Sequence, residues 1–492
     1  MEGCRARARW VTIFVGISAL VGVKGDDHMI DFYDPRTRRS FLQVGSLGLG
    51  GMLGGFSLPR LLQAGTDPES SRILRDRSVV FLFMHGGPPQ AETFDPKMTA
   101  ASEYRCFNGE IRTAVPGLTY GASLEKLAKL ADKTTVVRSF QPGDGNHNIK
   151  PVVSPHSLDA NVGSLYSRIS GITDGKTGMP SNAVLLPRAV DEQAQTVTKQ
   201  FGDFSDTGKM GNAFAPFVPS GKGALMDNMK LKLSQTRLDD RRALLQTLDG
   251  FKRGLDATGT MDGIDKFNRQ AYDVILGGVT RAFDLSLEDP AVIARYDTSQ
   301  LVLPEKIDKK WNNHKNYRDH GQTLGKLMLL ARRLCEHGSR FVTVTTNFVW
   351  DFHADVNNAT LDEGMRYVGM PYDHAVSAFI EDVEARGLSD KILLVTCGEM
   401  GRTPKINAKG GRDHWGRLGP LLLYGGGLNL GPVVGRSDAV AGEPNSQPVK
   451  IENLLSTIFH RMFDVGELRL DSRVPRPLMQ LIESGRPIES VI

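Results

Sequence analysis

The chain has 492 residues, enough for one large domain or two ordinary ones with a substantial core. Hydrophobic residues make up 40%, charged residues 24% and aromatic residues 7%, a composition that excludes disordered, collagenous and polytopic membrane proteins. The 60 lysines and arginines against 56 acidic residues give a net charge of only +4, which does not indicate a nucleic-acid-binding protein. The 53 glycines and 25 prolines predict long irregular loops, and the four cysteines show no C-x-x-C spacing.

The N-terminal region carries an export pattern. A pair of arginines, Arg38 and Arg39, is followed by a weakly apolar, glycine-rich run over residues 44–62. This pattern is typical of a twin-arginine signal, so we expect residues 29–65 to be a signal peptide. We therefore expect an exported protein of the periplasm or cell envelope that meets the membrane only through this signal.

A second apolar segment, residues 10–23, lies upstream of this pattern. It is too short for a comfortable membrane span, which takes about 20 residues. We interpret residues 1–28 as a mis-annotated upstream extension and Met29 as the true start.

Strand and helix patterns alternate after the leader. Continuous apolar, β-branched runs predict buried strands at residues 78–84, 134–140, 340–346, 391–396 and 420–424. Amphipathic patterns predict helices at residues 124–130, 321–337, 371–386 and 451–463, and a helical segment at about 238–296. We predict a single α/β domain over residues 70–492, with a doubly wound, mostly parallel sheet flanked by helices.

Reactive side chains follow the predicted strands. In open α/β sheets, ligands bind beyond the carboxyl ends of the strands. The residues found after those ends are His85, His147, Asp351, His353, Glu399 and His414. Asp351 and His353 are two residues apart, so both face the same side if the strand geometry continues, and such a pair can hold a cation. A lone Asp-x-His is more often a hydrogen-bonded turn, but Glu399 and His414 favour a metal site of the zinc, iron or manganese type.

Two arginines, Arg402 and Arg412, flank the same region. A guanidinium beside a cation site suits a phosphate or sulfate ester. Alternatively, the two arginines pair with Glu399 and Asp413, and the sequence leaves both interpretations open.

Several motifs together carry a family resemblance. Besides the twin-arginine leader, they are Gly86-Gly87-Pro88, Glu92-Thr93-Phe94-Asp95-Pro96-Lys97, Trp350-Asp351-x-His353, Gly398-Glu399-x-Gly401-Arg402-Thr403-Pro404 and Gly411-Arg412-Asp413-His414-Trp415. With them the chain resembles the DUF1501 family from about residue 78 to its end, and the last two motifs are the specific ones. That family is similar to the alkaline phosphatase and sulfatase superfamily, which implies an alkaline-phosphatase-like fold with a metal-dependent hydrolase site.

The resemblance implies a set of roles for these residues. The metal ligands would be Asp351, His353, Glu399 and His414, with His85 as a further candidate. The cofactor would be a divalent metal, either Zn, Mn or Ca. His147 would act as general acid or base and Arg402 would offset the charge of an anionic small-molecule or glycan ester.

Two departures from the superfamily pattern stand out. Its hydrolases place an aspartate directly after the first strand, where this chain has His85. They also need a serine, threonine or formylglycine nucleophile, and the corresponding loop, residues 143–148, contains none. Either His85, Glu92 or His147 completes a changed site, or hydrolysis has been lost. The alternatives to an enzyme are a non-catalytic, metal-containing binding protein for an anionic glycan or protein partner, and a structural cell-envelope protein without metal.

Overall fold

A computed structural model describes residues 70–219 and 279–492. Seven strands form the central sheet, in the order β12 (Val433–Val434), β4 (Thr134–Val137), β11 (Leu421–Gly425), β8 (Ile392–Cys397), β1 (Ser78–Phe83), β7 (Phe341–Thr345) and β6 (Asn182–Leu185). β1 runs parallel to β7 and β8, and β6 runs parallel to β7. Within this sheet of the described residues, β11 alone is antiparallel to its neighbours, β4 and β8. The predicted α/β fold with a mostly parallel sheet is confirmed.

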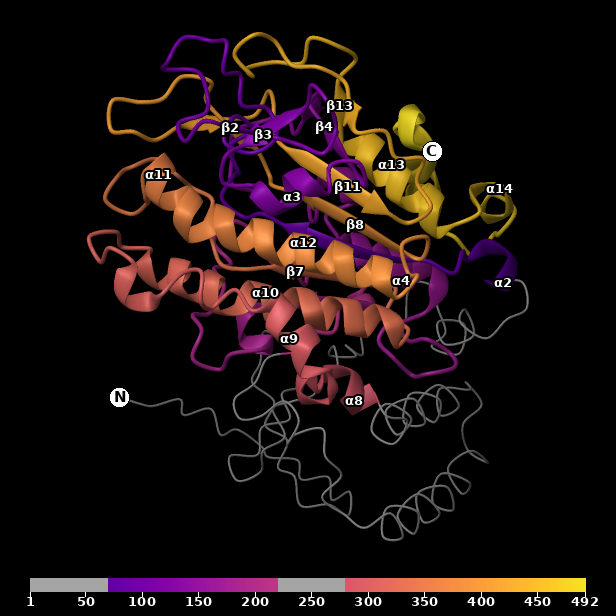
Figure 1. Ribbon diagram of the computed structural model, residues 1–492. Coiled ribbons are helices and arrows are strands. Elements are labelled where there is room, and N and C mark those ends of the chain that lie inside the picture. The colour runs from indigo at the N-terminus through magenta and orange to yellow at the C-terminus, as the bar shows by residue number, and fades with distance from the viewer. Residues whose placement is uncertain (1–69, 220–278) are drawn as a thin grey trace, which may run out of the picture.

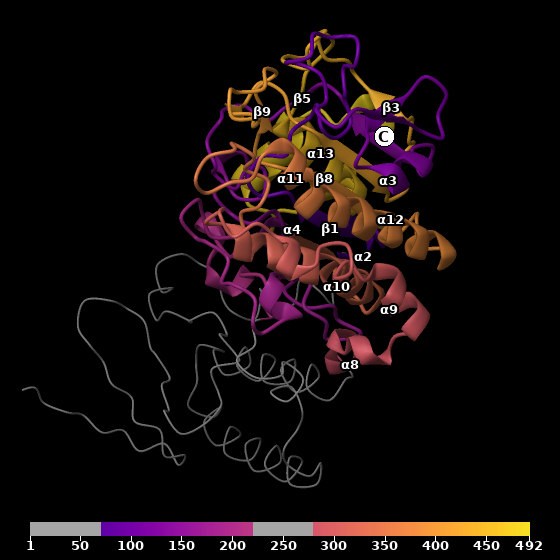
Figure 2. The same ribbon diagram turned by 60° about the vertical axis from the view of Figure 1, so that its left-hand side comes forward.

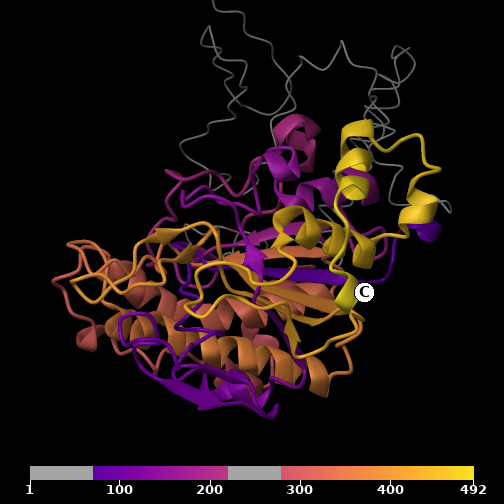
Figure 3. The same ribbon diagram turned by 90° about the horizontal axis from the view of Figure 1, so that it is seen from above.

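Helices cover both faces of the sheet, so the protein has three layers (Figures 1 and 3). One face carries α3 (Glu125–Lys129), α8 (Val279–Phe283), α9 (Pro290–Tyr296), α10 (His314–Glu336), α11 (Leu361–Gly364) and α12 (Met370–Ala385). The other carries α4 (Val162–Ser170), α13 (Ile451–Met462) and α15 (Arg476–Ser484), with α2 (Ser70–Ile73) and α14 (Val465–Leu468) beside them. Along β1, Val80 and Leu82 belong to the first core, whereas Val79 and Phe81 belong to the second. Both faces of this strand are buried, which explains its continuous apolar sequence.

Short strand pairs lie outside the main sheet. They are β2 (Glu110–Arg112) with β3 (Thr119–Gly121), β5 (Phe140–Gln141) with β13 (Val449–Lys450), and β9 (Gly401–Arg402) with β10 (His414–Trp415). The predicted strand at 134–140 is therefore divided into β4 and β5. The helix predicted from residue 321 begins earlier, at His314. The helix α4 and the strands β6 and β12 were not predicted from the sequence.

Some predictions fall wholly or partly outside the described residues. The upstream extension 1–28 and the signal peptide 29–65 lie there, as does the helical segment 238–296 up to residue 278. The described part of that segment contains α8 and α9, as expected from its pattern. Across residues 70–219 and 279–492, no helix combines the length and apolar character needed to cross a bilayer.

The direction of β11 determines what gathers at the carboxyl edge of the parallel strands. Because β11 is antiparallel to β8, the connection over residues 398–420 both begins and ends at that edge. Within it, β9 pairs with β10 so that Arg402 lies opposite His414. Figure 2 shows irregular segments from early and late parts of the chain beside β9. The glycine turn at 425–427 follows β11 and therefore lies at the opposite edge.

Candidate metal centre

Three neighbouring strands deliver polar side chains to one edge of the sheet. His85 follows β1, Asp351 follows β7 and Glu399 follows β8, and these three strands are adjacent. His147 arrives on the loop after β5, and His414 arrives on β10. The predicted convergence of strand-end loops is therefore present in the structure.

A glycine turn brings the loop after β1 against the Asp351 loop. Gly86 has a φ of 117°, and a Cβ atom there would lie 2.7 Å from the backbone nitrogen atoms of both Trp350 and Asp351. The His85 carbonyl oxygen accepts hydrogen bonds from the amides of Val349, at 3.1 Å, and Trp350, at 3.0 Å. Only glycine allows this close approach, which fixes the backbone on either side of Asp351.

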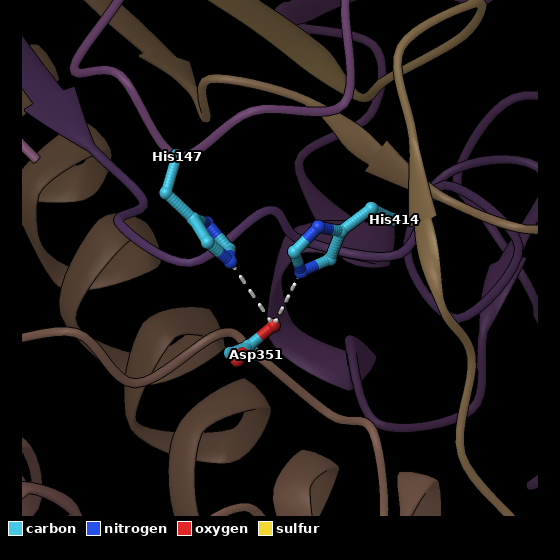
Figure 4. A group of neighbouring side chains, drawn as sticks. All are labelled: His147, Asp351 and His414. Carbon is cyan, nitrogen blue, oxygen red and sulfur yellow. Dashed lines mark ion pairs between the residues drawn. The ribbon is translucent and has the colours of Figure 1, made fainter.

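Two imidazoles point at a single carboxylate oxygen (Figure 4). His147 Nε2 lies 3.6 Å and His414 Nε2 lies 3.4 Å from Asp351 Oδ1. The ligand atoms of the three residues all lie within 4.8 Å of one another. His414 Nε2 is buried and has no hydrogen-bond partner. The three side chains thus form a cluster of two nitrogen donors and one oxygen donor.

The spacing of these donors fits a transition-metal ion. Tetrahedral zinc binds imidazole nitrogen and carboxylate oxygen at about 2.0–2.2 Å, so neighbouring ligand atoms are about 3.3–3.6 Å apart. The two nitrogen-to-oxygen distances in the cluster fall in that range. A donor set of two imidazoles and one carboxylate suits zinc or manganese better than calcium, which prefers oxygen ligands. The residues present therefore fit a divalent cation held by His147, Asp351 and His414.

Glu399 lies behind His147 rather than among the donors that face one another. It is fully buried, its Oε1 atom lies 2.9 Å from His147 Nδ1, and the Gly86 amide donates to it at 3.0 Å. An ionised Glu399 accepts the Nδ1 hydrogen of His147, which leaves the Nε2 lone pair facing Asp351. Burial raises the pKa of Glu399 to about 7 and lowers the pKa of His147 to about 3. His147 is therefore neutral at pH 7, which suits metal ligation or a role as base rather than as acid.

Asp351 is the most heavily contacted group of the cluster. Arg402 Nη2 donates to its Oδ1 atom, and Asn358 Nδ2 donates to its Oδ2 atom at 2.9 Å. Burial would raise the pKa of Asp351, but the Arg402 guanidinium and the imidazoles of His353 and His414 outweigh burial and hold that pKa well below its usual range. Asp351 is therefore an anion, and the guanidinium occupies part of the coordination space of its oxygen.

His353 links two carboxylates. Its Nε2 atom lies 3.0 Å from Asp351 Oδ1, and its Nδ1 atom lies 2.9 Å from Asp413 Oδ1. Burial lowers the pKa of His353, but the two carboxylates outweigh burial and raise it overall. The structure thus brings His353 to the site, where its hydrogen bonds use both ring nitrogen atoms.

The remaining predicted residues fall in different places. His85 is buried at the edge of the site, both of its ring nitrogen atoms lack hydrogen-bond partners, and burial lowers its pKa to about 4. The expected alternative pairing of Arg402 and Arg412 with Glu399 and Asp413 is wrong. Arg402 contacts Asp351, whereas Arg412 is fully buried and donates to Glu92 at 3.0 Å. Because Arg412 and Glu92 are buried and pair with each other, neither is part of the candidate site.

Several neighbours of the cluster were not predicted from the sequence. Asn358 had no predicted role, and Asp413 was expected only as a partner of the arginines. Also not predicted were Phe201 and Phe348, whose ring centroids lie 5.0 Å and 4.6 Å from that of His147. Phe348 follows β7 as Asp351 does, so its position at a strand end was an available signal. Phe201 lies in an irregular segment, and nothing in the local pattern marks it.

The chain belongs to the family described as a protein of unknown function (DUF1501), which matches residues 76–492. The predicted family membership is confirmed. No curated protein matches the chain.

Among solved structures, the chain is similar to members of the sulfatase and phosphonate hydrolase type. The phosphonate monoester hydrolase SpPMH from Silicibacter pomeroyi is 11% identical, with 84% of this chain and 76% of that chain covered and a TM-score of 0.35. The PsFucS1 sulfatase from Pseudoalteromonas sp. is 11% identical, with 82% and 71% covered and a TM-score of 0.32. The structure of Ps i-CgsB in complex with k-i-k-neocarrahexaose is 12% identical, with 84% and 78% covered and a TM-score of 0.29. These are the kinds of protein that the family resemblance predicted.

Proposed function

We propose that this protein is a metal-dependent hydrolase of phosphate or sulfate esters. The observation that carries the proposal is the cluster in which two imidazole nitrogen atoms, from His147 and His414, converge on one buried carboxylate oxygen of Asp351. The metal identity predicted from the sequence, Zn, Mn or Ca, narrows on this donor set to zinc or manganese.

The charge around Asp351 supports an anionic substrate. Arg402 and His353 contact the same oxygen, and the raised pKa of His353 favours its charged form. Asp413 and Glu399 add two further carboxylates beside these groups. A bound divalent cation would therefore supply the net positive charge that attracts a phosphate or sulfate group.

The chain's own residues account for binding and proton transfer in this proposal. A divalent cation held by His147, Asp351 and His414 would supply Lewis-acid polarisation of an ester oxygen and would make water a stronger nucleophile at neutral pH. Arg402 is fully buried and donates to the carbonyl oxygen atoms of Gly86, Gly87 and Arg412 as well as to Asp351, so it orients the Asp351 carboxylate. His353 is partly exposed, and its Nε2 atom lies 3.0 Å from Asp351 Oδ1 and 3.2 Å from Arg402 Nη1, so it is placed to exchange a proton with the leaving oxygen while Asp413 orients its ring from Nδ1.

The second candidate is a non-catalytic binding protein for an anionic glycan or protein partner. The observation in its favour is the loop over residues 143–148, which carries His147 to the cluster without any serine or threonine. In this case the same cluster would hold a metal and an anion without turnover.

Turnover assays separate the two candidates. Purified protein is stripped with a chelator, reloaded with Zn²⁺, Mn²⁺ or Ca²⁺, and assayed on a panel of sulfate and phosphate monoesters. Restoration of hydrolysis by zinc or manganese supports the enzyme. Tight binding of the same anions with no hydrolysis under any metal supports the binding protein instead.

We also propose export by the twin-arginine route to the periplasm or cell envelope. The support is the sequence pattern around Arg38 and Arg39, which lies outside the described residues. Replacing both arginines with lysine is expected to leave the protein in the cytoplasm on cell fractionation. Unchanged export of that variant would contradict the proposed twin-arginine route, and the proposed activity would be unaffected.

A further inference from the structure

Two phenylalanines form an aromatic wall beside the metal cluster. The rings of Phe201 and Phe348 lie with centroids 5.0 Å apart and planes tilted by 32°. Both side chains are partly exposed, whereas the neighbouring Phe83 and Phe204 are only 1% and 4% exposed. The wall therefore differs from the core phenylalanines around it in keeping a solvent-facing surface.

The wall touches the cluster directly. The His147 ring lies 4.6 Å from the Phe348 ring and 5.0 Å from the Phe201 ring, centroid to centroid. On another side, the His147 ring lies 4.2 Å from that of His414. A group bound at the cluster therefore lies within a few ångströms of both polar side chains and an aromatic surface.

The wall is firmly backed from behind. The buried His85 ring meets the rings of Phe348 and Phe201 edge-on, at 5.1 Å and 5.8 Å, and its nitrogen atoms have no hydrogen-bond partners. Phe204 packs edge-on against the same imidazole at 6.0 Å. With aromatic rings packed behind it, the wall has little freedom to collapse into the site, so its exposed surface is available to a ligand.

We propose that the wall of Phe201 and Phe348 receives the ring of the substrate, so that the preferred substrates are sulfate or phosphate esters whose alcohol part carries an aryl or sugar ring. This inference rests on the proposed function and adds the substrate class to it. The anionic group is held at the cluster, while the ring of the alcohol part packs on the wall. Burial of a ring against two aromatic faces discriminates against small alkyl esters, by about 10- to 200-fold for a hydrophobic pocket of this kind.

The test compares esters that differ in the ring and little in the basicity of the leaving alcohol. kcat/KM is measured for benzyl and methyl phosphate, and for benzyl and methyl sulfate, on the wild type and on Phe348→Leu and Phe201→Leu. Phe217→Leu is the matched control, because Phe217 is also partly exposed but packs against Phe283, at 5.5 Å, away from the cluster. Thermal unfolding of each variant shows that it is folded.

We expect the wild type to prefer the benzyl ester at least tenfold. Phe348→Leu and Phe201→Leu should each reduce the benzyl-to-methyl ratio about threefold or more, while Phe217→Leu leaves that ratio unchanged. A wild type without preference for benzyl esters, or a ratio that neither wall variant changes, would overturn the inference.

Failure of the proposed function gives a different result, namely no hydrolysis of any ester with any of the metals. The wall is then tested by calorimetric titration with benzyl and methyl phosphate. Tighter binding of benzyl phosphate that weakens in Phe348→Leu supports the wall, and equal binding of the two esters contradicts it.

Discussion

Two partly buried clusters of charged residues in this protein differ in how completely their polar atoms are paired. The first lies between α10, α12 and the turn before α9, and consists of Glu288, Arg332, Arg333, Asp382 and Arg386. Its arginines contact carboxylates at 2.7–2.9 Å, for example Arg332 with Glu288 and with Asp382. In the second, at the carboxyl edge of the sheet, His414 Nε2 and both ring nitrogen atoms of His85 lack hydrogen-bond partners.

The difference separates a structural cluster from a candidate site. A buried polar atom without a partner costs about 1–3 kcal/mol, so such atoms are rare unless something else satisfies them. The arginine network needs nothing more, and we interpret it as structural. The histidine cluster is incomplete, and its open nitrogen atoms are of the kind that bind metal.

The largest expected effect is on metal affinity, when a ring nitrogen atom without a hydrogen-bond partner is removed. We expect His414→Ala to reduce Zn²⁺ or Mn²⁺ affinity at least a hundredfold with little change in thermal unfolding of the metal-free protein, because His414 Nε2 loses only its 3.4 Å contact with Asp351. Calorimetric titration measures the affinity. His156→Ala is the control, since His156 is similarly exposed but pairs with Glu452, at 3.0 Å, outside the site. Equal metal binding by the two variants would contradict the ligand assignment.

The opposite behaviour is expected in the arginine network. Asp382→Ala removes one of the carboxylates that contact the buried Arg332, which keeps Glu288 and Glu336, and should lower the free energy of unfolding by about 1–3 kcal/mol, with metal binding unchanged. Urea titration measures this loss. Asp362→Ala removes an exposed pair with Arg366 at 2.8 Å and should cost less than about 1 kcal/mol. If the two substitutions cost the same, the network is not the structural element inferred from its pairing.

The smallest expected effect concerns pH. Burial would raise the pKa of Glu288, but Arg332 and Arg333, with Arg386, outweigh burial and lower that pKa to about 2 from an ordinary value of 4.5. A carboxyl with a lowered pKa in the folded state stabilises the protein above about pH 4.5 and loses this contribution as the pH falls toward 2. The difference in unfolding free energy between wild type and Glu288→Gln should therefore be smaller at pH 3 than at pH 6. A difference that stays constant would show that the Glu288 charge contributes nothing.

Much of the fold could be predicted from the sequence because its signals are local. Continuous apolar runs located β1, β7, β8 and β11, since strands buried on both faces need no polar alternation. The direction of β11 could not be predicted, because it depends on pairing with β4 and β8, which are distant in the sequence. That direction is what brings Arg402 and His414 back to the carboxyl edge.

Most residues of the candidate site could be predicted from the sequence, but their arrangement could not. Strand-end positions identified Asp351, Glu399 and His414, because parallel strands place such ends together. The arrangement required distances: Glu399 lies behind His147, and Arg412 pairs with Glu92 away from the cluster. Residue spacing along the chain does not indicate which of two converging loops directs its side chain toward the other donors.

The metal cluster is tested most directly by diffraction from crystals soaked in Zn²⁺, with data collected on both sides of the zinc absorption edge. We expect an anomalous peak between His147 Nε2, Asp351 Oδ1 and His414 Nε2, about 2.0–2.2 Å from each. Absence of a peak there, with Arg402 still bound to Asp351 and His414 Nε2 still unpaired, would contradict the account.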